Sequence, residues 1–141
     1  MNHLKEIIDY GVIGLLVLMS FVSVWLTIER WLFFRSVDLS RYKTKEELEV
    51  DLTNNISIIA TIASSAPYIG LLGTVFGIML TFYTMGQQGI VETKAIMTGL
   101  ALALKATAMG LLVAIPATWF YNYLVRKVEV SVALWEARYA S

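Results

Sequence analysis

The stretch from Ala95 to Val125 constrains this chain most, because it is a continuous run of apolar and small residues with one charge, Lys105. At about 1.5 Å per residue, a helix of this length exceeds the roughly 30 Å of a bilayer's hydrocarbon core. We predict a membrane-spanning helix over 96–125 that packs against other helices as well as lipid. Its small residues recur every three or four positions and share one helical face: Gly99, Ala103, Thr107, Gly110 and Ala114.

The composition indicates an integral membrane protein and excludes several other classes. Hydrophobic residues make up 57% of the chain and charged residues 16%, against about 25% charged in soluble domains. The 11 basic and 11 acidic residues balance, so there is no basic excess with which to bind nucleic acid. With no cysteine and one histidine, the chain offers no thiolate or multi-histidine site, and we expect neither metal nor cofactor.

Two further apolar runs predict two more membrane-spanning helices. Residues 10–28 and 67–85 contain no charge, and each is close to the ~20 residues that one crossing needs. Residues 1–9 form a short polar lead, a polar loop covers about 30–66, and a polar helical tail follows the third span. The predicted fold is all-α, a single domain over 1–141 with three transmembrane helices and helical extensions on the cytoplasmic side.

The loop after the first span carries its own helix signals. Thr44 is followed three residues later by Glu47, which is the pattern of a capping box. Apolar residues then recur at three- and four-residue spacings from Leu48 to Ala63, which predicts one amphipathic helix. This helix either packs on its own bundle or docks a partner. Pro67 marks either a kink or a fresh helix start.

Basic residues are unevenly divided between the two sides of the membrane that these spans define. Only Lys5 and Lys94 lie on the side of the N-terminus. The positive-inside rule therefore places the N-terminus outside and the loop and C-terminal tail in the cytoplasm. The basic residues of the cytoplasmic side are Arg30, Arg35, Arg41, Lys43, Lys45, Arg126, Lys127 and Arg138.

The second span carries a stripe of glycine and threonine on one face: Gly70, Thr74, Gly77, Thr81 and Thr84. Glycines let helix backbones approach closely, and threonine hydroxyls can bond across helices or to water. The stripe is therefore either a helix-packing seam or the lining of a pore. We assign helix packing to these residues of the second and third spans: Gly70, Gly73, Gly77, Gly99, Ala103, Gly110, Ala114 and Pro116.

No acidic residue falls inside the three predicted spans, so the chain has no acid of its own there to carry a proton. It also shows no Ser/His/Asp set and no phosphate-binding glycine loop, and we expect no enzyme activity. Because three helices enclose little space, the two stripes should face a central axis in a homo-oligomer, or a partner helix held there.

Lys105 has two interpretations that the residues leave open. Side chains on a helix lean toward its N-terminus, so the amine could reach the outer membrane surface along the apolar stem. Alternatively, it meets a partner's acid or water in a polar cavity. Lys105 lies about 200° from Ala103 and about 160° from Thr107 around the helix, so it does not share the small-residue stripe.

Two stretches resemble the ExbB/TolQ/MotA proton-channel family, and within it most of all the ExbB group. They are APYIGLLGTVFGIM (66–79) and LALALKATAMGLLVAIPATWFYN (100–122), and Glu29-Arg30 also fits. The resemblance implies a multi-pass protein of the bacterial inner membrane, in a pentamer of three-span subunits around a dimer of a single-span partner, ExbD. It implies that this assembly uses the proton gradient to drive TonB, which opens outer-membrane transporters.

The resemblance also implies roles for particular residues. The hydroxyls of Thr74 and Thr107 would face the central pore, and we place Thr81 and Thr84 with them. An aspartate on the partner helix would carry the proton. The family commonly has a glutamate at the position of Leu102, and usually an apolar residue at that of Lys105. The role of that glutamate therefore does not transfer to this chain.

Other functions fit the same pattern. A TolQ-like subunit of the Tol-Pal envelope system would differ in its partner, and a passive membrane scaffold would use the stripes only to pack helices. A small secondary transporter is disfavoured, because the sequence has no inverted repeat and no midplane binding residue besides Lys105.

Overall fold

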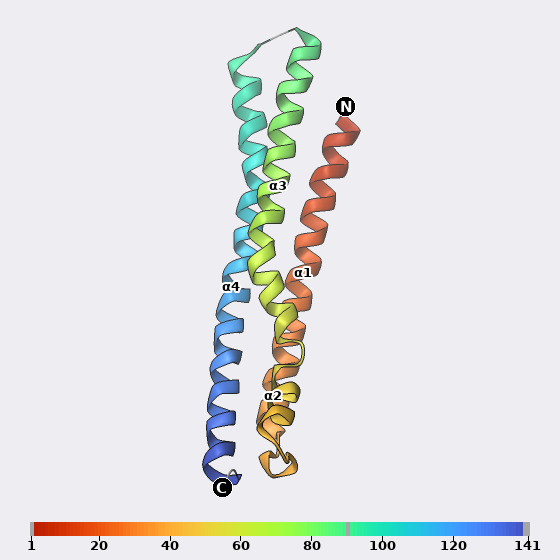
Figure 1. Cartoon of the computed structure of the whole chain (residues 1–141). Coiled ribbons are helices and arrows are strands. Elements are labelled where there is room, and N and C mark those ends of the chain that lie inside the picture. Colours follow the sequence, from red (N-terminus) through yellow and green to blue (C-terminus); the bar gives the residue numbers. More distant parts are fainter. Residues whose placement is uncertain (1, 90, 140–141) are drawn as a thin grey trace.

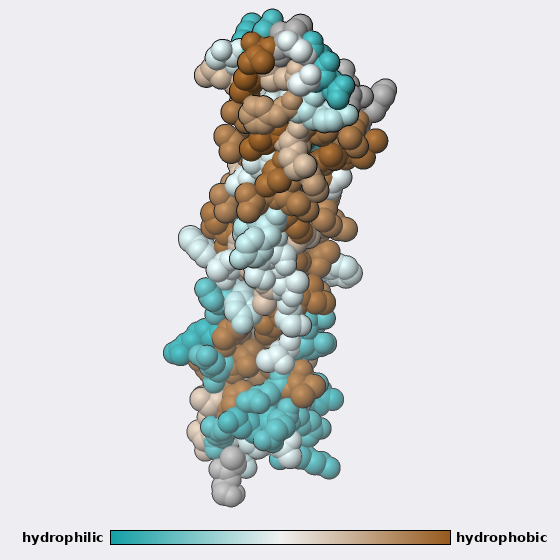
Figure 2. All heavy atoms as spheres, turned by 45° about the horizontal axis from the view of Figure 1, so that its top comes forward, coloured by the Kyte–Doolittle hydropathy of each residue, from teal (hydrophilic) through white to brown (hydrophobic). Residues whose placement is uncertain are grey.

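The computed structural model describes residues 2–89 and 91–139 as an elongated helical bundle (Figure 1). Three of its helices, α1, α3 and α4, are long and apolar enough to cross a membrane, as the sequence predicts. Figure 2 shows apolar side chains over much of the bundle and hydrophilic ones at both ends, with a large group at the end that carries α2. The elements are α1 (Asn2–Ser36), the 3₁₀ turn η1 (Leu39–Arg41), α2 (Lys45–Thr53), α3 (Ile56–Gln88) and α4 (Thr93–Tyr139).

The long helices extend beyond the apolar runs that predicted them. The polar lead from Asn2 onward is part of α1 rather than a separate segment, although Met1 lies outside the described residues. α3 already begins at Ile56, so Pro67 lies inside it, and a fresh helix start at the proline is wrong. A proline inside a helix removes one backbone hydrogen bond. Ala66, the preceding residue, is fully buried in the bundle, and this packing holds the backbone helical through the proline.

The predicted amphipathic helix is wrong as one element, because it divides into α2 and the start of α3. Asn55 adopts the left-handed conformation, with φ of 69°, and ends the continuity between Thr53 and Ile56. Asparagine tolerates this conformation better than most residues. The apolar repeat itself is correct, because Leu48 and Leu52 are fully buried and pack within this chain.

The start of α2 confirms the capping prediction. The Thr44 hydroxyl accepts a hydrogen bond from the backbone N–H of Glu47 at 3.1 Å. The Glu47 carboxylate reaches back and accepts from the backbone N–H of Lys43 at 3.4 Å, one residue before the cap. The local sequence therefore fixes where this helix begins.

One contact sets the level of α1 against the other two long helices. A Cβ built on Gly73 of α3 would lie 3.0 Å from Val12 Cγ1 and 2.8 Å from Ala106 Cβ. These three residues therefore lie at the same height in the bundle. Figure 1 shows that the C-terminal end of α3 and the N-terminal end of α4 extend beyond the N-terminal end of α1.

Candidate functional site

α3 and α4 approach each other so closely that several glycines touch the opposite backbone. A Cβ on Gly70 would lie 2.6 Å from the carbonyl oxygen of Ala106, and one on Gly110 would lie 2.6 Å from that of Ala66. A Cβ on Gly77 would lie 2.8 Å from Ala103 Cβ. Larger residues at these positions would push the helices apart. We call this contact the α3–α4 seam, and its buried members are Ala66, Gly70, Gly73, Thr74, Gly77, Gly99, Ala103, Ala106, Gly110, Val113, Ala114 and Ala117.

Two threonine hydroxyls meet across the seam near its middle. Thr74 on α3 is only 5% exposed, and its Oγ1 donates to the carbonyl oxygen of Ala103 on α4 at 2.8 Å. The Thr107 hydroxyl of α4 lies within hydrogen-bonding distance of the same Oγ1. Thr107 is half-buried at the edge of the seam. The pair is uncharged and can exchange hydrogen bonds with water or with an acid brought to that edge.

Thr81 and Thr84 lie in a different setting, nearer the α3–α4 turn. The Thr81 hydroxyl donates to the Gly77 carbonyl oxygen at 2.8 Å, and both threonines line an open cavity of about 530 Å³. Lys5 of α1 and Glu92 also line this cavity. The threonine stripe of the second span is thus divided. Thr74 lies in the seam, whereas Thr81 and Thr84 border a cavity that α1 helps to form.

The two departures from the expected pattern, Leu102 and Lys105, lie away from the seam. Leu102 is 45% exposed and the Lys105 side chain is exposed. Lys105 forms no ion pair within 4 Å among the described residues. In one subunit, therefore, neither residue reaches the Thr74–Thr107 pair, and both are available to whatever covers this face of α4.

Arg30 is a buried charge whose role the sequence did not reveal. It is 3% exposed, and its Nη1 donates to the carbonyl oxygens of Asp51 at 2.7 Å and Leu52 at 3.4 Å. Its Nε donates to the Glu29 carboxylate at 2.6 Å, and its guanidinium lies 4.3 Å from the centre of the Phe33 ring. Arg30 thus holds the C-terminal end of α2 against α1. The last turn of α2 has no basic residue of its own near the terminal carbonyl groups. That absence is the one sequence signal that could have suggested a donor from another helix.

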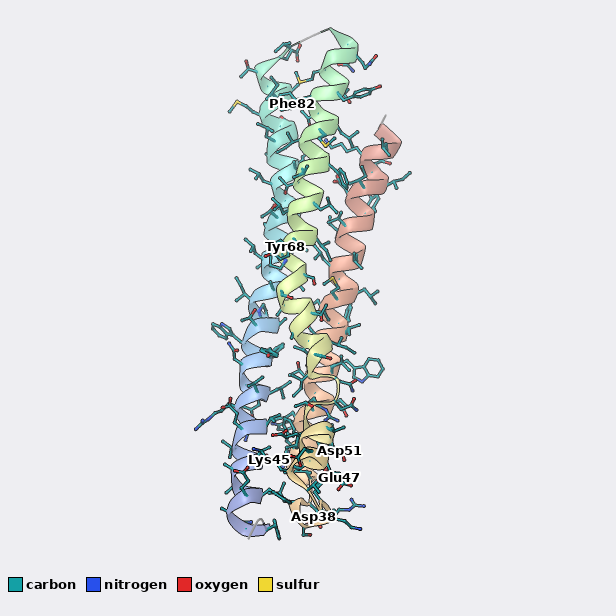
Figure 3. The ribbon with its side chains drawn as sticks, in the orientation of Figure 1. Asp38, Lys45, Glu47, Asp51, Tyr68 and Phe82 are labelled. Atoms are coloured by element: carbon teal, nitrogen blue, oxygen red, sulfur yellow. The ribbon has the colours of Figure 1, made fainter. Side chains whose placement is uncertain are left out.

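The α2 end of the molecule has a small polar network of its own around Lys45 and Asp51, which Figure 3 labels. Lys45 pairs with Glu136 of α4 at 3.0 Å, and the Tyr42 hydroxyl donates to the Asp51 carboxylate at 2.9 Å. The hydrogen bond to Glu136 raises the pKa of Lys45, and burial raises the pKa of Tyr42. Within the described residues no cluster of three acidic or histidine side chains could hold a metal ion.

Comparison with known proteins identifies close relatives across nearly the full length of the chain. A protein named biopolymer transport protein ExbB from Aquifex aeolicus is 59% identical over 137 residues, covering 97% of this chain and 93% of the relative. A putative biopolymer transport protein, ExbB-like 2, from Helicobacter pylori is 53% identical over 133 residues, covering 94% and 89% of the two chains.

The similarity extends to proteins with a different name. The Tol-Pal system protein TolQ from Haemophilus influenzae is 42% identical over 95 residues, covering 67% of this chain but 40% of that protein. The profile of the MotA/TolQ/ExbB proton channel family matches residues 25–137, which include α2, α3 and most of α4. This chain, a multi-pass membrane protein with three long apolar helices, therefore belongs to the MotA/TolQ/ExbB proton channel family.

Proposed function

We propose that this chain is the inner-membrane proton-channel subunit of an ExbB–ExbD-type motor, which uses the proton motive force to energise TonB-dependent outer-membrane transport. Five copies would surround an ExbD-like single-span protein with an aspartate in its helix. The Thr74–Thr107 pair carries the proposal, because it places two uncharged hydroxyls, one buried and one half-buried at the edge of the seam, in a pair of helices long and apolar enough to cross a membrane. Such a pair can bind water and orient an acid without titrating itself.

The arrangement of the helices suggests how the subunit would stand in the membrane. With the N-terminus outside, α2 and the last turns of α4 form a cytoplasmic extension, where the basic residues of the loop and tail also lie. The exposed edge of the seam would face the central axis, with Thr74 and Thr107 lining it and Thr81 and Thr84 nearer the outer side. The glycines of the seam would keep the two pore-lining helices in contact.

Proton flux through the reconstituted complex tests this function. The subunit and its ExbD-like partner would be placed in liposomes, and the flux would be measured under an imposed proton gradient. Thr74→Ala with Thr107→Ala should reduce the flux at least tenfold, because the hydroxyls that bind water would be gone. Thr118→Ala is the matched control, since its hydroxyl donates to the Ala114 carbonyl oxygen of its own helix at 2.8 Å. An unchanged flux in the double variant would refute the pore assignment.

A TolQ-like role in the Tol-Pal system is the second candidate, favoured by the similarity to the Haemophilus influenzae TolQ protein. The two roles use the same channel chemistry and differ in the protein that the motor drives. Affinity purification from the native membrane distinguishes them. Recovery of a TonB-like protein supports the first role, and recovery of Tol-Pal components supports the second. A passive scaffold would show no proton flux in the liposome assay.

A further inference from the structure

The position of α1 along the other two long helices brings Asp9 of α1 and Lys105 of α4 to the same height in the bundle. α1 and α4 run in the same direction, and Val12 and Ala106 lie at one height against Gly73. Asp9 precedes Val12 by three residues and Ala103 precedes Ala106 by three, so Asp9 lies level with Ala103. Lys5 confirms this register, because it lines the same cavity as Gly99, which the same counting places beside it.

Asp9 lies on the face of α1 that is turned toward the bundle. It is half-buried, as are Val12 and Lys5 on the same face, and it lies two helical turns from the fully buried Leu16. Ile7 and Tyr10 on the outer face are instead 67% and 75% exposed. The sequence placed Asp9 outside the first span, but the structure places it about 4.5 Å, three residues of helix, from the level of Gly73 in the middle of α3.

Lys105 lies at the edge of the contact between α4 and α1, and its side chain is exposed. It precedes Met109 by four residues, so the two side chains share a face of α4. Met109 is half-buried and packs against the cluster that contains Leu16 of α1. Lys105 is two residues past Ala103, and helical side chains lean toward the N-terminus, so an extended lysine would carry its amine toward the level of Asp9. Aligned side chains of opposite charge thus lie on facing surfaces of α1 and α4.

We propose that Asp9 and Lys105 form an ion pair between α1 and α4 of the same subunit when the chain is in a membrane. An isolated charge among apolar helices is costly there, and pairing is the usual remedy. Lys5, four residues before Asp9 on the same face of α1, is the other cation near it. Lys5 lies one helical turn nearer the α3–α4 end and lines the cavity that Glu92 also borders. Glu6, one turn before Asp9, is exposed and carries the same charge. Lys105 is the cation that faces Asp9 from another helix, and the pair would draw the N-terminal half of α1 onto α4.

The pair has a consequence that rests on the proposed function. A lysine neutralised within its own subunit adds no free positive charge beside the partner's acid. The channel would then bind and release protons through that acid with only hydroxyls and water around it. Lys105 would hold α1 in place instead of meeting the translocated proton.

Cross-linking tests the pair without any need for proton transport, because the chain contains no cysteine. Asp9→Cys with Lys105→Cys would be expressed in native membranes and treated with a short bifunctional thiosulfonate reagent. We expect a link within one chain, seen as a joined peptide pair in mass spectrometry while the protein still migrates as a monomer on a denaturing gel. Ile7→Cys with Lys105→Cys is the control, since Ile7 lies on the outer face of α1, and its yield should be at least fivefold lower.

Charge exchange provides the second measurement. Asp9→Lys alone and Lys105→Asp alone should each lower the thermal unfolding midpoint of the purified subunit, and the two together should restore most of the loss. Links between two chains, equal yields in the Ile7 control, or an additive loss in the double reversal would each overturn the proposal. None of these results depends on proton flux, so a failed pair and a failed channel assignment can be told apart.

Discussion

The α3–α4 seam and the α2 end are held together by opposite means. The seam is built from the smallest side chains, and its strength comes from backbones that touch across Gly70 and Gly110. The α2 end is built from large side chains, with Leu48, Leu52 and Trp135 buried in one cluster and Arg30 tying it to α1. In lipid, apolar helices gain no hydrophobic free energy by associating. Close van der Waals packing therefore replaces apolar burial as the force that holds the α3–α4 seam together. The α2 end is stabilised as a water-soluble domain is, by the burial of large apolar side chains.

This contrast predicts opposite sensitivities to substitution. The seam should be damaged by added atoms and the α2 end by removed atoms. Four substitutions test this contrast by the free energy of unfolding in detergent, and they follow in order of expected effect.

Trp135→Ala should have the largest effect, a loss of about 3–5 kcal/mol, which is typical of removing a buried tryptophan. The side chain is 5% exposed, and its Nε1 donates to the Tyr42 carbonyl oxygen at 3.3 Å. Denaturant unfolding followed by circular dichroism would measure the loss. Trp119→Ala is the control, because that tryptophan is 73% exposed. An equal loss of unfolding free energy in the control would show that burial of Trp135 in its cluster adds no stability.

Gly70→Ala should cost about 2–3 kcal/mol, the upper part of the range for overpacking, because its Cβ would collide with the Ala106 carbonyl. The same measurement on Gly14→Ala should show no loss, since a Cβ there meets nothing within 4 Å. A seam that accepted the methyl group without loss would contradict the close backbone contact.

Arg30→Met should cost about 1–2 kcal/mol, because the Asp51 carbonyl oxygen would lose its buried donor while the apolar volume is kept. The pair with Glu29 adds little, since that carboxylate is 38% exposed. Hydrogen exchange of the last turn of α2 would locate the effect. Exchange that was faster throughout the chain, and equally fast in Arg35→Met, would argue against a local role at the end of α2.

Lys45→Met should have the smallest effect, because both members of the Lys45–Glu136 pair are nearly half exposed. Glu136 raises the pKa of Lys45, so the pair stabilises fully below the ordinary lysine pKa of about 10.4. The contribution disappears as the pH rises through the raised pKa. Unfolding compared at pH 8 and at pH 11 should therefore show a difference between variant and parent that shrinks at the higher pH. A difference between variant and parent that was larger at pH 11 than at pH 8 would contradict the raised pKa of Lys45.

The local features of the fold could be predicted from the sequence, and the features that depend on neighbours could not. Apolar runs gave the three long helices, and Thr44 with Glu47 gave the start of α2. The break at Asn55 was missed because the apolar repeat continues through it, although two adjacent asparagines are a signal for such a turn. Of the two alternatives at Pro67, the fresh helix start is wrong because local propensity is outweighed by packing around Ala66.

The candidate site divides in the same way. Spacing placed Thr74 and Thr107 on stripes of their helices, but only the structure shows their hydroxyls in contact across the seam. The position of Asp9 could not be predicted, because the sliding of one helix along another depends on contacts such as Val12 against Gly73. The sequence places Arg30 among the basic residues just after the first span. Its burial depends on the position of the C-terminal end of α2, where it donates to the Asp51 carbonyl oxygen.

The continuity of α4 has a mechanical consequence. It is a single helix of 47 residues, about 70 Å long at 1.5 Å per residue, and Pro116 lies within it without ending it. Thr107 and Trp135 are therefore carried on the same stiff rod. A rotation or axial slip imposed at one is therefore transmitted to the other by α4 itself, with no separate transmission element.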